Sequence, residues 1–339
     1  MTRTKSLVIL AAAATLLFAA PAFAQKPHHH QNTAQQKDAK MQIHQVASDA
    51  IEIRLGPYDL PANTGHDVMP QAPDFIWEVP FDGWLVAYAP SLIDGQGNDI
   101  PQKLLHHVAF YNTGRSDFLC PEKEEHIFGA GGEMNRWPPL PGFGYQVHRG
   151  DRIRINTMFH NPTKTSYPKA FLAVQVDYVT ADQTQSGIPK LRSVYPVWFD
   201  VMQCGESAWD LKVGESVKSG QFVMQQPGLL LGLGGHLHDY GHSLTVTNQT
   251  RKQSIAKLTA ELDPMGSIQA MPVITFINSG GYHLDVNDKI QVSAEYQNLS
   301  GATIPDGAMG IAVGYFLPDD ANSMNGFARA PREKKSPAK

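Results

Sequence analysis

The chain has 339 residues, with 28 lysine and arginine residues against 32 aspartate and glutamate residues, so its formal net charge is −4 at pH 7. This mild acidity argues against nucleic acid as a partner, because nucleic-acid-binding surfaces are basic. After a leader at the N-terminus, no apolar stretch approaches the roughly 20 residues that a transmembrane helix needs, so no membrane span is expected.

Residues 1–24 have the pattern of a secretory signal peptide. Two positive residues, Arg3 and Lys5, precede an apolar core, and Ala-Phe-Ala at residues 22–24 forms an A-x-A cleavage site. Cleavage removes two positive charges and no negative ones, which moves the net charge from −4 to −6. The pattern predicts an exported protein, located in the periplasm or outside the cell.

The rest of the chain is predicted to form two β-rich units between polar ends. Residues 25–44 are rich in glutamine, histidine and lysine, which predicts a disordered linker; its run of three histidines could bind metal, although a flexible leader is the favoured interpretation. Short strand-like segments, frequent turns and no long amphipathic helix predict an all-β fold of antiparallel β-sandwiches, at residues 45–182 and 190–320. The basic tail at residues 321–339 is expected to be disordered.

Three histidines of the first unit lie in or beside strand-like segments. His106 and His107 interrupt the apolar run LLHHVAFY of residues 104–111, and His160 ends the alternating stretch RIRINTMFH that begins at Arg152. Side chains alternate between the two faces of a strand, so the rings of His106 and His107 are expected on opposite faces. A metal shared by this pair requires a local twist or the use of different ring nitrogens.

The second unit holds a His-X-His pair and a methionine. The run LLLGLGGHLH of residues 229–238 places His236 and His238 on the same face of a strand, as ligands of one metal. Met309 directly precedes the strand-like stretch GIAVGYF. Thioether sulfur is a soft, weak donor that suits Cu(I) and is rarely used for zinc. Together these residues predict two copper sites, one with three imidazoles and one with two imidazoles and a thioether.

At these positions the sequence resembles the copper type II, ascorbate-dependent monooxygenases, a family that includes peptidylglycine α-hydroxylating monooxygenase and dopamine β-monooxygenase. The similarity covers roughly residues 51–318 and is carried, in this order, by HHVAFYN, MFHNP, GGHLHDYG and DGAMGIAVGYF. It implies two jelly-roll-like β-sandwich domains in tandem, each with one copper ion and with the active site in the cleft between them. The implied ligands of the electron-transfer copper are His106, His107 and His160. Those implied for the catalytic copper, where oxygen and substrate react, are His236, His238 and Met309.

The resemblance also implies a reaction. The family hydroxylates a C–H bond of a small-molecule substrate with O2, and an external reductant such as ascorbate supplies the two electrons of each turnover. Peptide-amidating members bind the peptide carboxylate through an arginine, an asparagine and a tyrosine, whose positions here hold Gly234, Ile311 and Val313. None of these side chains binds a carboxylate, so the expected substrate is uncharged or hydrophobic and is not a peptidylglycine.

Two other functions are compatible with parts of the sequence. A periplasmic copper-binding protein for storage or delivery, without catalysis, would tolerate the loss of the carboxylate anchor. Such a carrier, however, has little need for two chemically different copper sites. A zinc hydrolase fits poorly, because Met309 would be an unusual zinc ligand and no carboxylate general base stands out.

The remaining candidate residues leave alternatives open. Cys120 and Cys204 form either one disulfide, which export permits, or two buried free thiols. Asp239, directly after the His-X-His pair, could orient a ligand imidazole, although a surface turn is the favoured interpretation. His66 lacks a partner motif.

Overall fold

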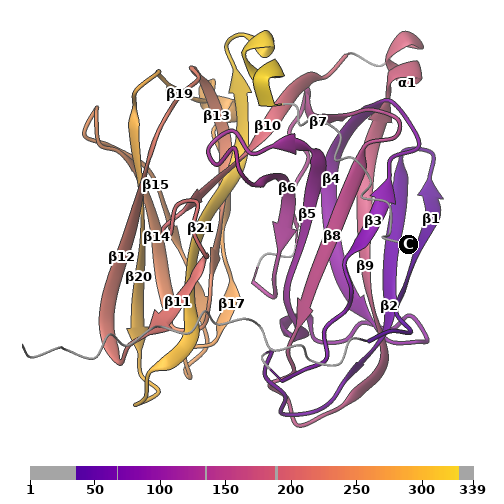
Figure 1. Cartoon of the computed structure of the whole chain (residues 1–339), viewed down its shortest axis with the longest axis vertical. Helices are drawn as coiled ribbons and strands as arrows, with labels where there is room; N and C mark the ends of the chain where they lie inside the picture. The colour runs from indigo at the N-terminus through magenta and orange to yellow at the C-terminus, as the bar shows by residue number, and fades with distance from the viewer. Residues whose placement is uncertain (1–35, 67, 134–135, 188–189, 328–339) are drawn as a thin grey trace, which may run out of the picture. The chain divides into compact units, whose positions relative to one another are not determined.

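The computed structural model describes residues 36–66, 68–133, 136–187 and 190–327, all of which belong to one compact unit. The predicted signal peptide and most of the predicted linker and tail lie outside these residues. No helix in the described ranges is both long and apolar enough to cross a membrane. Nearly all of the regular structure is β-strand, so the predicted all-β class is confirmed (Figure 1).

The first sandwich packs two sheets from the N-terminal half of the chain around one apolar core. One layer has the order β1 (Lys40–Ala47), β2 (Ala50–Leu60), β9 (Tyr167–Thr180), β4 (Gly83–Ile93) and β7 (Phe143–Val147). The facing layer has the order β3 (Phe75–Glu78), β8 (Arg152–Phe159), β5 (Leu105–Ser116) and β6 (Glu124–Ala130). Strand alternation explains β8, because Ile153, Ile155 and Phe159 are buried while Arg152 and Arg154 lie on the other face.

The second sandwich is built from the C-terminal half in the same way, around a second apolar core. One layer contains β10 (Arg192–Asp200), β21 (Ile304–Pro318), β13 (Gly228–Leu237), β18 (Val273–Thr275), β11 (Ala208–Leu211) and β19 (Tyr282–Leu284). The facing layer has the order β12 (Gly214–Val223), β20 (Lys289–Asn298), β14 (Gly241–Asn248) and β15 (Gln253–Thr259). A small separate sheet contains β16 (Glu261–Leu262) and β17 (Ile268–Ala270).

One long sheet joins the two sandwiches. β7 pairs in parallel with β10, from Phe143↔Arg192 to Tyr145↔Val194. This pairing joins one layer of each sandwich into an 11-stranded sheet. The helical segments are short: η1 (Gln102–Leu104), α1 (Ala181–Gln185), η2 (Ile277–Ser279) and η3 (Ala321–Phe327). The domain limits expected at residues 182 and 190 stay a prediction, and α1 lies between the two halves.

The strand β21, yellow in Figure 1, supplies residues to both apolar cores. Its residues Ile311 and Val313 pack into the first core, whereas Ala312 and Phe316 pack into the second. A strand that is buried on both faces has no polar alternation, which explains the nearly continuous apolar sequence after Met309. β21 therefore carries residues that belong to both halves of the molecule.

Two ends of the described chain are more ordered than the sequence predicted. Residues 40–44 of the expected linker lie in β1, where Ile43 pairs with Ile53 and β2 supplies the hydrogen-bonding partner. At the other end, residues 321–327 of the expected tail form η3, and Met324 is buried in the second core. In both places a tertiary contact orders a segment whose local composition is that of a disordered chain.

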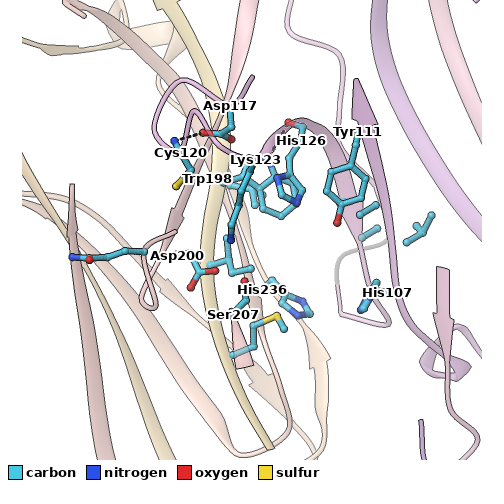
Figure 2. A pocket seen from close by; sticks show the side chains of 18 residues that line it. His107, Tyr111, Asp117, Cys120, Lys123, His126, Trp198, Asp200, Ser207 and His236 are labelled. Atoms are coloured by element: carbon cyan, nitrogen blue, oxygen red, sulfur yellow. Dashed lines mark hydrogen bonds between the residues drawn. The ribbon is translucent and has the colours of Figure 1, made fainter. Parts of the chain in front are cut away.

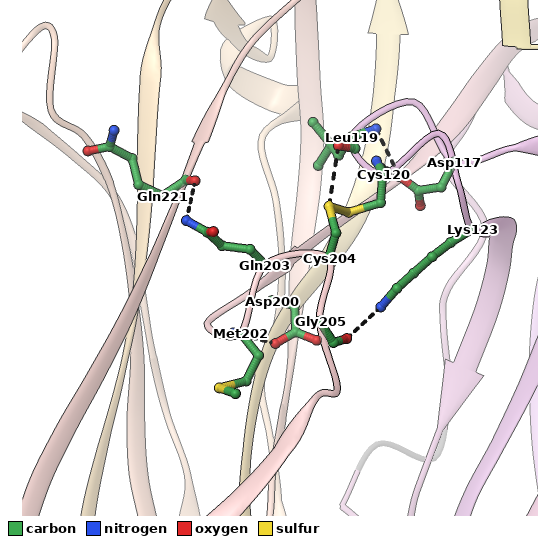
Figure 3. The surroundings of a disulfide bond; sticks show 10 residues. All are labelled: Asp117, Leu119, Cys120, Lys123, Asp200, Met202, Gln203, Cys204, Gly205 and Gln221. Atoms are coloured by element: carbon green, nitrogen blue, oxygen red, sulfur yellow. Dashed lines mark hydrogen bonds between the residues drawn. A yellow bond between two sulfur atoms is a disulfide. The ribbon is translucent and has the colours of Figure 1, made fainter. Parts of the chain in front are cut away.

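The two cysteines form a disulfide, so the open alternative is settled in its favour (Figure 3). Cys120 lies in the loop after β5 and Cys204 in the loop after β10, at a sequence separation of 84 residues. Next to the bond, the ammonium of Lys123 donates a hydrogen bond to the carbonyl of Gly205 at 2.7 Å. The Asp117 carboxylate accepts from the backbone N–H of Cys120 at 2.9 Å. The bond thus links a loop of each half.

Candidate metal centre

A β-bulge lies at the adjacent histidines of β5. In the pairing of β5 with β8, Leu105 lies opposite Phe159 and His107 opposite Met158, so His106 is the extra residue. A bulge breaks the strict alternation of side chains and re-aims one of them. The rings of His106 and His107 therefore lie close together, with centroids 5.4 Å apart and planes at 45°. This is the local twist that a metal shared by the pair requires.

Hydrogen bonds fix which ring nitrogen of the first histidine set can bind a metal. His107 Nε2 donates to Asn156 Oδ1 at 3.2 Å, and the Asn156 amide donates in turn to Asp74 at 2.7 Å. His160, directly after β8, donates from Nε2 to the backbone carbonyl of Lys103 at 2.6 Å. In both rings Nδ1 keeps its lone pair. Metal-binding histidines characteristically donate their second N–H to a carbonyl, amide or carboxylate in this way.

His236, near the end of β13, is held by a buried acid. Its Nδ1–H donates to the Glu133 carboxylate, which is 4% exposed and comes from the loop after β6. Nε2 is therefore the ring nitrogen of His236 that is left to bind a metal. Glu133 is also tied to the second half through its own carbonyl, which accepts from the Met271 N–H at 2.9 Å. The hydrogen bond thus joins a residue of each half of the chain.

The phenol of Tyr296 on β20 positions the other two residues of the second set. Its hydroxyl accepts hydrogen bonds from the backbone N–H of His238 and of Met309, each at 3.0 Å. It also donates to the Met309 carbonyl. One side chain therefore fixes the backbone of both a histidine and the methionine that is distant from it in sequence.

The five predicted histidines form one cluster of rings, and Met309 lines a cavity together with His107 and His236. The rings of His106 and His160 have centroids 5.3 Å apart, and the rings of His236 and His238 are 5.4 Å apart. The two sets also meet, because the rings of His106 and His238 are only 4.8 Å apart. The assignment of the six residues to two separate copper ions stays a prediction.

Burial keeps most of these rings neutral. It lowers the pKa of His107 to about 4, and lowers the pKa of His160 as well. Burial, and then His238 and other neighbouring histidines, holds the pKa of His106 well below the ordinary value. Burial, and then His236 and other neighbouring histidines, does the same to the pKa of His238. For His236 burial acts in the same direction, but the charge and hydrogen bond of Glu133 outweigh it and raise the pKa. A neutral imidazole offers the lone pair that a metal needs.

The donor set fits copper. Nε2 of His238 is buried and has no hydrogen-bond partner among the described residues, a costly arrangement for a polar atom unless something binds it. Imidazole nitrogens and a thioether sulfur together suit copper better than zinc, calcium or magnesium. The histidine donor atoms are not converged on one point: in the described chain, three donors within 4.8 Å of one another occur only at Cys120, Glu122 and Cys204. The disulfide consumes both thiols of that group.

Two cavities meet at His236. The larger, of about 430 Å³, is lined by His106, His160, His236 and His238, and also by His66. Asp239 lines it too, but its carboxylate accepts from the Ile268 N–H at 2.9 Å and so holds a surface loop, as the favoured interpretation expected.

The smaller cavity, of about 140 Å³, lies beside three of the candidate ligands, namely His107, His236 and Met309. Its other walls are mainly apolar and aromatic: Val108, Ala109, Tyr111, His126, Gly129, Ala130, Trp198, Ile311 and Val313. Figure 2 shows His236 toward one end and Asp117 with Cys120 toward the other.

An aromatic stack forms one wall of the smaller cavity. The ring of His126 lies between Tyr111, at a centroid distance of 4.2 Å, and Trp198, at 4.4 Å (Figure 2). Burial lowers the pKa of His126 to about 3, so this ring is neutral. A side chain at Gly129 would collide with Trp198, because a Cβ there would lie 2.6 Å from the indole. The glycine lets the indole approach β6 closely.

The charged groups of the smaller cavity are already engaged. Burial raises the pKa of Asp200 to about 6, and its carboxylate accepts from the Met202 N–H at 2.8 Å. Lys123 is bonded to the Gly205 carbonyl. Two positions of the missing peptide anchor, Ile311 and Val313, line the wall with aliphatic groups. The cavity therefore offers apolar contact and no unpaired cation for a carboxylate.

Sequence reasoning missed Glu133, Tyr296 and the involvement of His66. Glu133 lies in a glycine-rich stretch and Tyr296 in an ordinary alternating strand, so neither carries a local motif. Only their tertiary contacts identify them.

Comparisons with known proteins point to copper oxygenases. Over 111 residues, 30% of this chain and 33% of the relative, the chain is 30% identical to the probable copper-dependent oxygenase clz3 of Cochliobolus lunatus. Over 234 residues, 64% of this chain and 58% of the relative, it is 23% identical to the probable copper-dependent oxygenase M1 of a Phoma species. The matches thus span a third and somewhat over half of these relatives' lengths. No family model matches the chain.

Solved structures give only weak likenesses. A peptide-N(4)-(N-acetyl-β-D-glucosaminyl) asparagine amidase has a TM-score of 0.40 and 10% identity, over 80% of this chain and 97% of that chain. PNGase F from Flavobacterium meningosepticum has a TM-score of 0.39 and 10% identity, over the same shares. Likeness at this level supports no conclusion about function. In sequence the chain is distantly similar to two fungal proteins described as probable copper-dependent oxygenases, and its own fold is all-β.

Proposed function

We propose that the protein is an exported dicopper monooxygenase that hydroxylates a C–H bond of a small, uncharged, apolar substrate with O2 and an external reductant such as ascorbate. The observation that carries this proposal is the donor set: histidine rings whose second nitrogens are hydrogen-bonded to Asn156, to the Lys103 carbonyl and to Glu133, with the Met309 thioether in the wall of the same cavity as His107 and His236. The distant similarity to proteins described as probable copper-dependent oxygenases supports it.

The two ligand sets differ in their donor atoms, which suggests different roles for the two copper ions. His106, His107 and His160 would hold the copper that stores and delivers an electron, and His236, His238 and Met309 would hold the copper at which oxygen and substrate meet. Bound copper would supply one-electron transfer and oxygen activation. The overall reaction balances as R–H + O2 + 2e⁻ + 2H⁺ → R–OH + H2O, with both electrons from the reductant.

The protein's own residues bind and orient the substrate in this proposal. The smaller cavity borders His236 and Met309, so a molecule there lies next to the proposed catalytic site. Ile311 and Val313 give the wall an aliphatic surface, and Trp198 and His126 add aromatic surface. A peptide carboxylate would be desolvated there without a partner, which costs several kcal/mol. Small aromatic or aliphatic compounds fit the cavity better than glycine-extended peptides.

Oxygen consumption tests the proposal. The copper-loaded protein with saturating ascorbate should take up O2 in proportion to hydroxylated product for at least one apolar compound of a C–H substrate panel. A glycine-extended peptide should give a rate near background. Incorporation of label from ¹⁸O2 into the product identifies a monooxygenase. Two bound coppers without substrate-dependent uptake would instead favour a copper carrier.

Metal analysis tests the two sites separately. About two coppers per chain are expected, with sulfur scattering from Met309 in the reduced protein. His160→Ala should empty the electron-transfer site alone, and His238→Ala the other. If either substitution empties both, the ligands form a single cluster and the division into two sites is wrong.

A further inference from the structure

A third space, called the side cavity below, adjoins the smaller cavity. It has a volume of about 10 Å³ and is lined by residues 127–129, by Trp137 and Trp198, and by residues 313–315. Gly129, Trp198 and Val313 also line the smaller cavity, so these three residues form the wall that the two spaces share. Glycine has no side chain and the side chain of valine is short. The indole of Trp198 therefore makes up most of the shared wall.

Strand geometry places this indole at the junction of the two cavities. On β21, Met309, Ile311 and Val313 line the smaller cavity, while Val313 and Tyr315 line the side cavity. Alternate residues of a strand point to the same face, so the two cavities follow one another along one face of β21. Trp198 on β10 pairs with Val313, the residue of this row that both cavities share.

Two contacts and a missing side chain hold the indole in this position. Its N–H donates to the His126 carbonyl at 3.1 Å, and its ring centroid lies 4.4 Å from that of the His126 ring (Figure 2). On another side, a Cβ at Gly129 would lie 2.6 Å from the indole, so the glycine leaves the room that the ring occupies. These contacts favour one orientation of the ring, and the indole therefore acts as a fixed partition.

The volume of the smaller cavity limits the size of a ligand. An apolar cavity of about 150 Å³ in another protein binds benzene. The smaller cavity, of about 140 Å³, therefore holds one six-membered ring. Its lining toward the disulfide is polar, with Asp117, Lys123 and Asp200, and desolvation of these groups disfavours a second apolar ring there. The lining toward the side cavity is apolar, but there the indole of Trp198 fills the space.

We infer that Trp198 determines the size of the substrate: it restricts the smaller cavity to compounds with a single six-membered ring, and a smaller residue at this position would admit two fused rings. The inference rests on the proposed function, because it takes the smaller cavity, beside His236 and Met309, as the substrate site. In such a variant the second ring would reach the side cavity. There it would meet Trp137 and Tyr315, whose ring centroids lie 5.1 Å apart.

Calorimetric titration of the full-length, copper-loaded protein with two neutral alcohols tests the inference. Benzyl alcohol has one ring and 2-naphthylmethanol has two fused rings, and without a reductant neither is turned over. The native protein should bind benzyl alcohol at least about 10-fold more tightly, since a single misfitting methylene already changes discrimination by about 10–200-fold. Trp198→Leu should reverse this preference. It should also bind benzyl alcohol roughly 2–10-fold more weakly, because one aromatic contact is lost.

Trp84→Leu is the matched control. Trp84 is buried, its indole N–H donates to the Ser193 hydroxyl at 3.1 Å, and it lines neither cavity, so its replacement should leave the preference unchanged. Thermal unfolding shows which variants fold. Trp198→Phe keeps a smaller aromatic ring in the wall and should show an intermediate preference, which provides the test if the leucine variant does not fold.

The inference is overturned if folded Trp198 variants keep the native preference for one ring, or if the native protein binds neither alcohol or both equally well. Turnover with ascorbate and O2 separates these outcomes from the proposed function. If the preference follows Trp198 but no compound is hydroxylated, the proposed function fails while the size limit of the cavity stands. Equal rates of hydroxylation of both alcohols by the native protein would support the proposed function and contradict the size limit.

Discussion

Replacement of Tyr296 by phenylalanine removes one hydroxyl and leaves the packing of the ring against Trp209 in place. The backbone N–H groups of His238 and Met309 lose their acceptor, and the Met309 carbonyl loses a donor. A buried polar group left without a partner costs about 1–3 kcal/mol. Because Met309 is only partly buried, we expect the free energy of unfolding to fall by about 2–4 kcal/mol.

Chemical denaturation of the apo protein measures this loss, and the unfolding temperature should fall by roughly 2 °C for each kcal/mol. The same change loosens two ligands, so sulfur scattering from Met309 in the Cu(I) protein should weaken. Tyr282→Phe is the control, since that hydroxyl donates only to the exposed Gln253 side chain. If Tyr296→Phe is as stable as the control and binds Cu(I) equally well, the hydroxyl does not position the ligands.

Three further predictions concern other buried contacts. Glu133→Gln keeps the shape of the side chain but removes the charge that holds His236. Copper affinity at the His236 site should therefore fall about 10–100-fold in a competition titration. An unchanged affinity would contradict the role of the acid. Burial raises the pKa of Glu125 from 4.5 to about 7. The contribution of this carboxyl to stability is therefore complete below pH 4.5 and is lost as the pH rises through 7. In Glu125→Gln, the change of the unfolding free energy between pH 5 and 8 should be smaller than in the native protein by up to about 3 kcal/mol, as denaturation at several pH values would measure. The double substitution of Cys120 and Cys204 by serine opens an 84-residue loop and should lower the unfolding free energy by about 4 kcal/mol, a change that dithiothreitol should reproduce in the native protein and not in the variant.

The parts of the fold that depend on local pattern could be predicted from the sequence. The alternation of RIRINTMF gave a strand with Ile153 and Ile155 inside, and the structure confirms it. The order of residues 40–44 and of η3 could not be predicted, because it comes from pairing with β2 and from the burial of Met324. Composition describes what a segment does alone, whereas β1 is held by its pairing with β2 and η3 by its packing into the second core.

In the candidate site, too, the features that depend on local pattern could be predicted and those that depend on tertiary contacts could not. Periodicity placed His236 and His238 together, and chemistry indicated a special role for Met309. The bulge at His106 was recognised only as a geometric requirement, because a bulge depends on the register of the neighbouring strand. Glu133 reaches His236 across 103 positions of sequence, and no spacing rule connects residues at such a distance.

The two-sided burial of β21 has a consequence for how the protein could change during evolution. Ile311 and Val313 meet the smaller cavity, while Ala312 and Phe316, their neighbours on the same strand, fill the second core. Gly310 belongs to the core side, since a Cβ there would lie 2.6 Å from Ala294. Mutations at odd and even positions are therefore selected by different demands. Under the proposed function, changes at Ile311 and Val313 would alter the substrate cavity within the limits set by the first core, whereas changes at Ala312 and Phe316 would disturb the second core.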